Sequence, residues 1–361
     1  MTATSPVSPA ASAPGPLEST AAAPRPGVAR TIATRTLWLG LAVVVLLGVM
    51  LLSIAVGTRP IAVSVVIDAL TAFDGSTEHL IVTELRLPRT LLGFGCGAAL
   101  GLAGAIMQAL TRNPLADPGI LGVNAGAAFA VVTAIFFFGF TSLTSYVWFA
   151  FTGALVTTVG VYALGSVGRS GATPVRLALS GVAIAAVLGG MTQAMTLIDI
   201  QAFDHFRHWT VGALAGRGMD TVAQVAPFLT AGVLLALGMG RLLNAVAMGD
   251  DLAKSLGASV VRARITGVVA ITLLCGAATA ATGPIGFLGL TVPHMARAVT
   301  GPDHRWVLPY ALVLSPILLL SADILGRVVA RPGELQVGLV TAFVGAPVFI
   351  ALVRRKRLAK L

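Results

Sequence analysis

Long runs without a single charged residue constrain this chain more than any other feature of its sequence. The runs extend over residues 36–58, 90–111, 118–168, 177–198, 221–240 and 265–296. One helical crossing of a bilayer needs about 20 apolar residues, so each run is long enough to span a membrane. Only 11% of the 361 residues are charged, whereas soluble domains carry about 25%. The chain is therefore predicted to be an all-α polytopic membrane protein.

Two of these runs are too long for one helix and contain their own breaks. Turn-forming residues over Gly139–Tyr146 divide the run 118–168 into two spans. The glycine-rich segment Gly283–Gly289 divides the run 265–296 into one full span and one shorter one. Two more apolar stretches follow, at about 306–326 and 334–353. The expected total is ten transmembrane helices within residues 35–357.

Three segments are expected to lie outside the membrane. Residues 1–34 are rich in Ala, Pro, Ser and Thr and hold no apolar run, which predicts a disordered cytoplasmic tail without the core of a signal peptide. Residues 61–85 contain a broken apolar stretch that ends in polar residues, which predicts a surface helix and loop on the opposite side. Residues 358–361 form the end of a second cytoplasmic tail.

The distribution of basic residues sets the expected orientation. When the loops are assigned alternately to the two sides, 17 of the 24 Lys and Arg residues fall on one side, including the cluster at 354–360. The positive-inside rule makes that side the cytoplasm and places both termini there, at the cell membrane. The basic residues do not gather on one polar face with aromatic residues, so no nucleic-acid partner is expected.

The sequence offers no group that would supply energy for transport. No Asp or Glu lies in the middle of a predicted span, which argues against an ion-coupled transporter. None of the lysines, Lys254, Lys356 and Lys360, belongs to a phosphate-binding loop, so the chain is expected neither to hydrolyse ATP nor to be an enzyme. Cys96 and Cys275 lie in apolar runs without a metal-binding spacing, and no metal site is predicted.

One cytoplasmic loop, at about 248–258, is polar enough to meet a soluble partner. Asp250 is expected to cap a short helix in this loop, and Gly257 is expected to end it. Leu252 and Leu256, at i and i+4, would form one apolar face. The alternative is an interfacial helix that touches only lipid headgroups, which two adjacent acids in the loop disfavour.

Six motifs spread along the chain form a distinctive set. They are LRLPRTLLGFGCGAALGLAGAIMQALTRNPLADPGILGVNAGA (84–127), LNAVAMGDDLAKSLG (243–257), GPIGFLGLTVPHMAR (283–297), GPDHRWVLP (301–309), SADILGR (321–327) and GLVTAFVGAPVFI (338–350). Together they resemble the FecCD-type permeases, the membrane subunits of bacterial ABC importers for ferric siderophores, haem and cobalamin. The resemblance covers about 36–357 and is strongest to the subunits for ferric catecholate siderophores, through LTRNPLADPG, LGVNAGA, DHRW and the VRRK ending.

The resemblance implies a type II ABC importer permease fold with ten spans per subunit. It also implies two permease subunits around a central pathway, two cytoplasmic ATPases that hold ATP and Mg²⁺, and an extracytoplasmic siderophore-binding protein; this chain itself would bind no cofactor. A heterodimer with a second, homologous permease is favoured, and a homodimer is the alternative. The expected substrate is a ferric siderophore of the catecholate, enterobactin-like class, with cobalamin or haem as the alternative within the family.

The same resemblance assigns residues to the ATPase contact and to the gate. The ATPase contact would comprise Gly249, Asp250, Asp251, Leu252, Ala253, Lys254, Leu256 and Gly257. The gate would lie partly on Asn113, Pro114 and Leu115. Its other part would lie before the fifth span on Pro174 and Val175, where the cobalamin permease carries small hydroxyl residues instead.

The polar side chains expected to line the pathway are Gln108, Asn113, Asn124 and Gln193. Met107, Met191 and Met195 are further candidates, and core packing is the alternative for each of them. His294 has no second ligand at a usable spacing and is expected to pack rather than to bind iron.

Three arginines, Arg86, Arg89 and Arg327, are expected at the extracytoplasmic rim. Guanidinium groups suit bidentate capture of carboxylates, and the matching residues of the cobalamin permease meet acids of its binding protein. These arginines are therefore predicted to dock the binding protein, and anchoring to lipid headgroups is the alternative.

Overall fold

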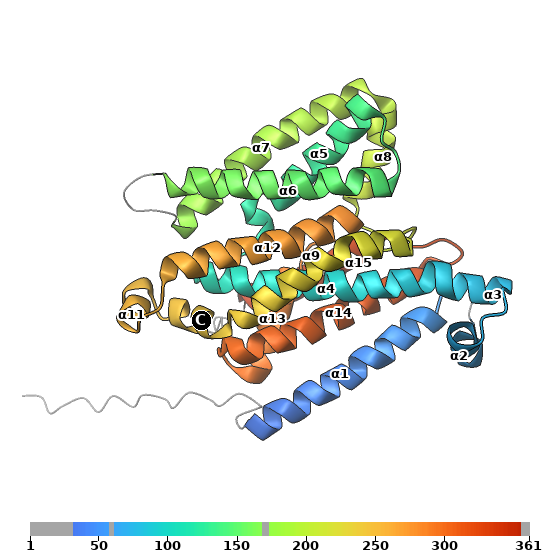
Figure 1. Ribbon diagram of the computed structural model, residues 1–361, viewed down its shortest axis with the longest axis horizontal. Coiled ribbons are helices and arrows are strands. Elements are labelled where there is room, and N and C mark those ends of the chain that lie inside the picture. Colours follow the sequence, from blue (N-terminus) through green and yellow to red (C-terminus); the bar gives the residue numbers. More distant parts are fainter. Residues whose placement is uncertain (1–31, 58–60, 168–172, 355–361) are drawn as a thin grey trace, which may run out of the picture.

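The computed structural model describes residues 32–57, 61–167 and 173–354. Within these ranges the ordered elements are all helices, which confirms the predicted all-α class. The long helices run roughly along one axis of the molecule, with α11 (Asp250–Ser255) at one end and α3 (Thr77–Leu80) at the other (Figure 1). We refer to these as the α11 end and the α3 end. The predicted tail 358–361 lies outside the described residues, as does most of the tail 1–34.

Seven helices in the described part of the chain are long and apolar enough to cross a membrane. They are α1 (Ile32–Ala55), α4 (Leu87–Thr111), α6 (Leu143–Ser166), α7 (Pro174–Ile198), α9 (Met219–Gly238), α12 (Val260–Thr282) and α14 (His304–Val329). Two further apolar helices, α5 (Val123–Phe138) and α15 (Val337–Arg354), are shorter, and α13 (Leu288–Thr300) is shorter still. The chain is thus a multi-pass membrane protein, and the total of ten spans stays a prediction.

Glycines at positive φ divide the long apolar runs where the sequence placed the breaks. Helix α5 ends before Gly139, at φ 67°, and α6 begins four residues later. Helix α12 ends before Gly283, at φ 75°, and α13 begins at Leu288. Glycine adopts positive φ without the steric cost that a Cβ atom brings, so it ends a helix at these points.

Short helices occupy the connections at both ends. At the α3 end, α2 (Val63–Thr71) forms the predicted surface helix, and a π-helical turn (Ile81–Arg86) joins α3 to α4. Helix α8 (Ile200–Thr210) follows α7, and α10 (Gly240–Ala247) leads into α11.

Only 17% of the apolar segment of α7 is buried, against 83% for the α3–α4 segment, so α4 lies at the centre and α7 at the margin.

Glycines let α14 approach the central helix α4 closely. A Cβ atom on Gly97 would lie 2.7 Å from Pro316 Cα, and one on Gly101 would lie 2.5 Å from Ser315 Cβ. Small residues at this spacing allow two backbones to pack tightly inside a membrane, where packing contributes much of helix association. The contact fixes α4 against α14, and both helices carry charged residues at the α3 end.

Candidate functional site

A buried ion-pair network lies at the α3 end, centred on Asp323 of α14. Arg89 of α4 contacts both oxygens of this carboxylate, with Nη2–Oδ1 at 2.8 Å and Nε–Oδ2 at 3.0 Å. Its Nη1 also donates to Oε2 of Glu334 at 2.7 Å. Arg327, one helical turn after Asp323, pairs with Oδ2 at 2.9 Å. The Asp323 side chain is fully buried, and the two arginines balance its charge together with that of Glu334.

The same network is tied to the end of α1. Arg327 Nη1 donates to the carbonyl oxygens of Ser53 and Val56, both at 2.8 Å. Arg86 Nη1 donates to the carbonyl oxygens of Ile54 and Ala55, at 2.8 and 2.7 Å. These arginines thus satisfy the carbonyl groups that the last turn of a helix leaves without intrahelical partners.

This arrangement corrects the expected geometry of the three rim arginines. Arg86, Arg89 and Arg327 are all buried, and their guanidinium groups contact groups of this chain rather than open solvent. The sequence reading missed Asp323 and Glu334, which supply the countercharges. The i, i+4 spacing of Asp323 and Arg327 in SADILGR was the local signal available. Docking of a binding protein at this end stays a prediction.

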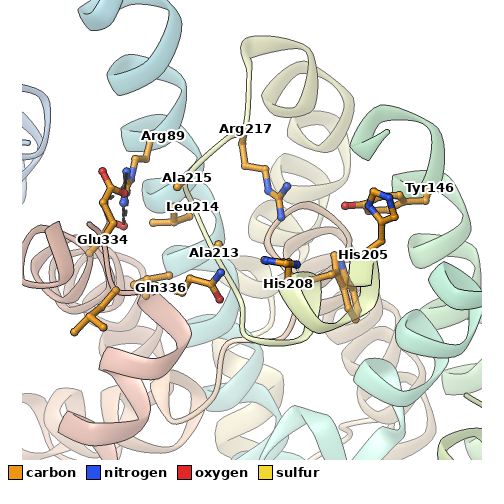
Figure 2. A pocket seen from close by; sticks show the side chains of 14 residues that line it. Arg89, Tyr146, His205, His208, Ala213, Leu214, Ala215, Arg217, Glu334 and Gln336 are labelled. Carbon is orange, nitrogen blue, oxygen red and sulfur yellow. Dashed lines mark hydrogen bonds and ion pairs between the residues drawn. The ribbon is translucent and has the colours of Figure 1, made fainter. Parts of the chain in front are cut away.

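Two adjacent cavities open beside this network. One, of about 350 Å³, is lined by α8, the start of α15 and the connection 213–217. Figure 2 shows Arg217 reaching from that connection toward His208, while Arg89 and Glu334 pair on the opposite side. The second cavity, of about 450 Å³, shares Arg89, Arg217 and Glu334 with the first.

Arg217 differs from the other arginines of these cavities. Among the described residues no carboxylate forms an ion pair with it, and its Nε atom is shielded from solvent without a hydrogen-bond partner. Burial lowers the pKa of its guanidinium group, and the phenol of Tyr146 opposes that shift. A cation held in this way favours an anionic ligand.

At the α11 end, the short helix of the predicted ATPase contact is present. Leu252 and Leu256 are 48% and 62% exposed, while Ala253 is buried against the protein. Gly257 has φ 78° and follows the helix, so it forms the expected ending. The face that carries the two leucines is therefore open to a partner.

Asp250 does not cap this helix, so that expectation is wrong. Gly249 occupies the N-cap position at φ 112°, and Asp250 is the first helical residue. Its carboxylate instead pairs with Arg264 of α12 at 2.7 Å and with Arg112 at 3.4 Å. Two cations nearby compete more strongly for the carboxylate than backbone amides do.

The predicted gate turn follows α4 directly. Arg112 caps α4 in the left-handed conformation, at φ 49°, and turns the chain into residues 113–115. Asn113 is exposed, and its Oδ1 accepts from the Leu115 amide at 3.0 Å, which holds Pro114 in a tight turn. Val175, 68% exposed, lies in the first turn of α7, which begins at Pro174. The gating role of these residues stays a prediction.

Two predicted pathway residues form hydrogen bonds between helices. Gln108 is fully buried; it donates to the Gly289 carbonyl at 3.1 Å and accepts from Arg297, which ties α4 to α13. Asn124 accepts from the Thr279 hydroxyl at 3.1 Å and ties α5 to α12. Both side chains thus connect helices, and their role in the pathway stays a prediction.

The remaining candidates of that set divide by exposure. Met107 is buried in the core, whereas Met191 and Gln193 of α7 are exposed and Met195 is half-buried. His294 Nδ1 lies 2.9 Å from the Leu290 carbonyl of its own helix, as packing requires. Within the described ranges no group of three or more His, Cys, Asp or Glu side chains could hold a metal ion.

Comparison with known proteins gives a consistent result. The model of the FecCD transport family matches residues 44–355. The ferric enterobactin transport system permease protein FepD of Escherichia coli K12 is 51% identical over 306 residues, which cover 84% of this chain and 91% of that protein. The Fe(3+)-citrate import system permease protein YfmD of Bacillus subtilis 168 is 42% identical over 306 residues, covering 85% and 91%.

A solved structure shares the fold. It is described as an inward-facing conformation of a transporter assigned to the metal-chelate ABC type. The TM-score is 0.77 at 24% identity, and the match covers 88% of this chain and 99% of that one. At this identity the match shows the arrangement of helices, which agrees with the predicted ABC importer permease fold.

Proposed function

Because the chain belongs to the FecCD transport family, we propose that it is the membrane-spanning permease subunit of an ABC importer for a ferric siderophore of the catecholate class. The observation that carries this proposal is the extent of its identity to the ferric enterobactin permease, which spans most of both chains. Transport into the cytoplasm would then be the whole task of this subunit.

Energy would come from two ATPase subunits that bind ATP and Mg²⁺. Helix α11 supports this role because its two exposed leucines form a small apolar face on a loop that is otherwise polar. Leu252 and Leu256 would enter a groove of the ATPase, and the α11 end would face the cytoplasm together with both termini. The permease itself is proposed to be non-catalytic.

A second, homologous permease would complete the pathway. Helix α7 is the expected contact because most of its surface is exposed. Its outward side chains are apolar, including Leu179, Val182 and Val187. A heterodimer is favoured, and the predicted gate residue Val175 lies at the start of this same helix.

Substrate entry is proposed at the α3 end, where the binding protein would dock. A tris-catecholate complex of ferric iron is an anion, since its phenolate oxygens outweigh the charge of the metal. Arg217 faces the 350 Å³ cavity without a carboxylate partner among the described residues. Its charge would attract such an anion and favour it over a neutral ligand.

Uptake measurements test the proposal. A strain that lacks this gene is complemented with the wild-type gene and supplied separately with radiolabelled ferric enterobactin, haem or cobalamin. We expect restored uptake of the catecholate complex alone, and loss of that uptake when the ATPase gene is deleted. Restored uptake of haem or cobalamin without the catecholate would assign another substrate. Uptake that persists without the ATPase would contradict an ABC importer.

A further inference from the structure

Asp250 joins three separate elements at the α11 end. It is the first residue of α11, and its two oxygens face arginines on two different helices. Oδ2 lies 2.7 Å from Nη2 of Arg264 on α12, and Oδ1 lies 3.4 Å from Nη2 of Arg112 at the end of α4. One carboxylate thus connects the proposed ATPase contact to two membrane helices.

Arg112 leads directly into the predicted gate. It holds the left-handed conformation at the end of α4, which a non-glycine residue adopts at a cost and which tends to mark functional positions. The next residue, Asn113, opens the turn 113–115. A Cβ atom on Gly249 would lie 3.6 Å from Arg112 Nη1, so the guanidinium group of Arg112 lies next to the start of α11.

The link between Asp250 and Arg112 is incomplete. Oδ1 is shielded from solvent and has no hydrogen-bond partner within the described residues; its distance to Arg112 is beyond that of a good charge-assisted hydrogen bond. The link to Arg264 on the other oxygen is already short. A small shift of α11 toward α4 would complete the first link, and a shift away would break it.

Partial exposure allows these links to change during a transport cycle. The side chains of Arg112, Asp250 and Arg264 are 40%, 30% and 19% exposed. Water can therefore solvate the charges when a link opens, which a fully buried pair would not permit. The longer link, to Arg112, can therefore be made and broken at low cost, while the shorter link to Arg264 holds Asp250 in place.

We propose that Asp250 is a positioning residue that transmits movement of α11 through Arg112 to the gate turn 113–115, with Arg264 as its fixed anchor on α12. The inference rests on the proposed function, in which α11 receives its movement from an ATPase, and on the predicted gate at the turn 113–115. It predicts that ATP hydrolysis and gate movement can be separated by removing one carboxylate charge.

A thiol reporter on the gate turn tests this relay in the assembled importer. Asn113→Cys provides an exposed thiol, whereas Cys96 and Cys275 are buried and shielded from reagents. The rate of labelling by a membrane-impermeant maleimide is measured with and without ATP. Uptake of ferric enterobactin per ATP hydrolysed is measured in the same vesicles.

Four backgrounds are compared. Asp250→Asn, Arg112→Gln and Arg264→Gln each remove one member of the relay. Arg262→Gln is the matched control, because Arg262 lies on the same turn of α12 as Arg264, is exposed and forms no ion pair within the described residues. Total protein in the membrane and ATP hydrolysis are recorded for each background.

We expect Asp250→Asn and Arg112→Gln to abolish the ATP-dependent change in labelling and to lower uptake per ATP by about tenfold, the usual size of a coupling between sites. ATP hydrolysis should continue. Arg262→Gln should behave as the wild type. Asp250→Glu keeps the negative charge. If the ATP-dependent change in labelling rate returns in this variant, the charge of residue 250, and not a disturbed fold, accounts for its loss in Asp250→Asn.

An ATP-dependent labelling change that persists in Asp250→Asn would overturn the relay. If that variant fails to assemble, Arg112→Gln decides the matter, since it leaves the Asp250–Arg264 pair intact. Failure of the proposed function has a different signature: the wild type then shows ATP-dependent labelling but no uptake of ferric enterobactin. A wild type without any labelling change would contradict the relay itself.

Discussion

The two ends of the molecule hold similar groups of charges in opposite surroundings. At the α3 end, Arg89 and Arg327 enclose an Asp323 carboxylate that is fully buried. At the α11 end, Arg112 and Arg264 flank an Asp250 carboxylate that is partly exposed. Burial keeps the ion pairs of the first group formed, because an opened pair would leave charges in a medium of low polarity. Partial exposure allows the ion pairs of the second group to open, because water can solvate a charge that loses its partner.

The largest effect should follow removal of the buried charge. Asp323→Asn leaves Arg89 and Arg327 without their shared countercharge, and breaking a buried pair in this way costs about 3–5 kcal/mol. We expect a marked fall in folded protein and in the thermal unfolding temperature after purification in detergent. Asp220→Asn, at an exposed position outside the ion pairs found in the described residues, is the control. An unchanged unfolding temperature for Asp323→Asn would contradict the view that the buried ion pairs at the α3 end stabilise the fold.

A smaller effect, on transport rather than folding, is expected at the cavity beside the same network. Arg217→Gln removes a cation that has no carboxylate partner among the described residues, so stability should change little. The half-saturating concentration for uptake of ferric enterobactin complex should rise by about tenfold, as for the loss of one charged hydrogen bond. Arg217→Lys should recover part of the affinity. Equal transport kinetics in Arg217→Gln and wild type would remove Arg217 from the entry route.

The partly exposed acid at the α11 end should matter little for stability. We expect Asp250→Asn to lower the free energy of unfolding by less than about 1 kcal/mol, because its side chain and that of Arg112 are partly exposed to water. The measurement is the same unfolding assay used for Asp323→Asn. A loss of unfolding free energy as large as that of Asp323→Asn would mean that the ion pairs at the α11 end cannot open at low cost. The proposed relay would then lose its physical basis.

The smallest effect is expected at Asp303, between α13 and α14. Hydrogen bonds from Arg305, whose charge adds to them, and from Asn244 lower the pKa of this carboxyl to about 2 against burial. A lowered pKa stabilises the folded state above the unfolded value of about 4 and loses this effect as pH falls toward 2. Asp303→Asn should cost less than about 1 kcal/mol at pH 7, since its partner Arg305 is largely exposed and water screens the pair.

The pH dependence supplies the check on this last expectation. The difference in unfolding temperature between Asp303→Asn and wild type should shrink between about pH 4 and pH 2. Asn can still act as the N-cap of α14 and still bond to Asn244. A difference that stays constant over this pH range would point to lost packing instead of lost charge.

The sequence by itself determined the class of the protein, the length of most helices and their breaks. Backbone amides have no water to bond inside a bilayer, so an apolar run of sufficient length must form a helix that satisfies them internally. Gly139 and Gly283 ended helices at predicted places for a local reason as well, since glycine adopts their positive φ angles without the steric cost of a Cβ atom. The exposed face of Leu252 and Leu256 followed from helical spacing alone.

Only the tertiary structure decided which charged and polar groups meet. Arg89 and Asp323 are 234 positions apart, and Gln108 contacts Arg297 and Gly289 across a comparable distance in sequence. A local rule assigned Asp250 to a helix cap, because such a rule considers only neighbours along the chain. The packing of α4 against α14 and of α11 against α12 brought stronger partners within reach, and a charge in a poorly solvated site binds the nearest countercharge that the fold provides.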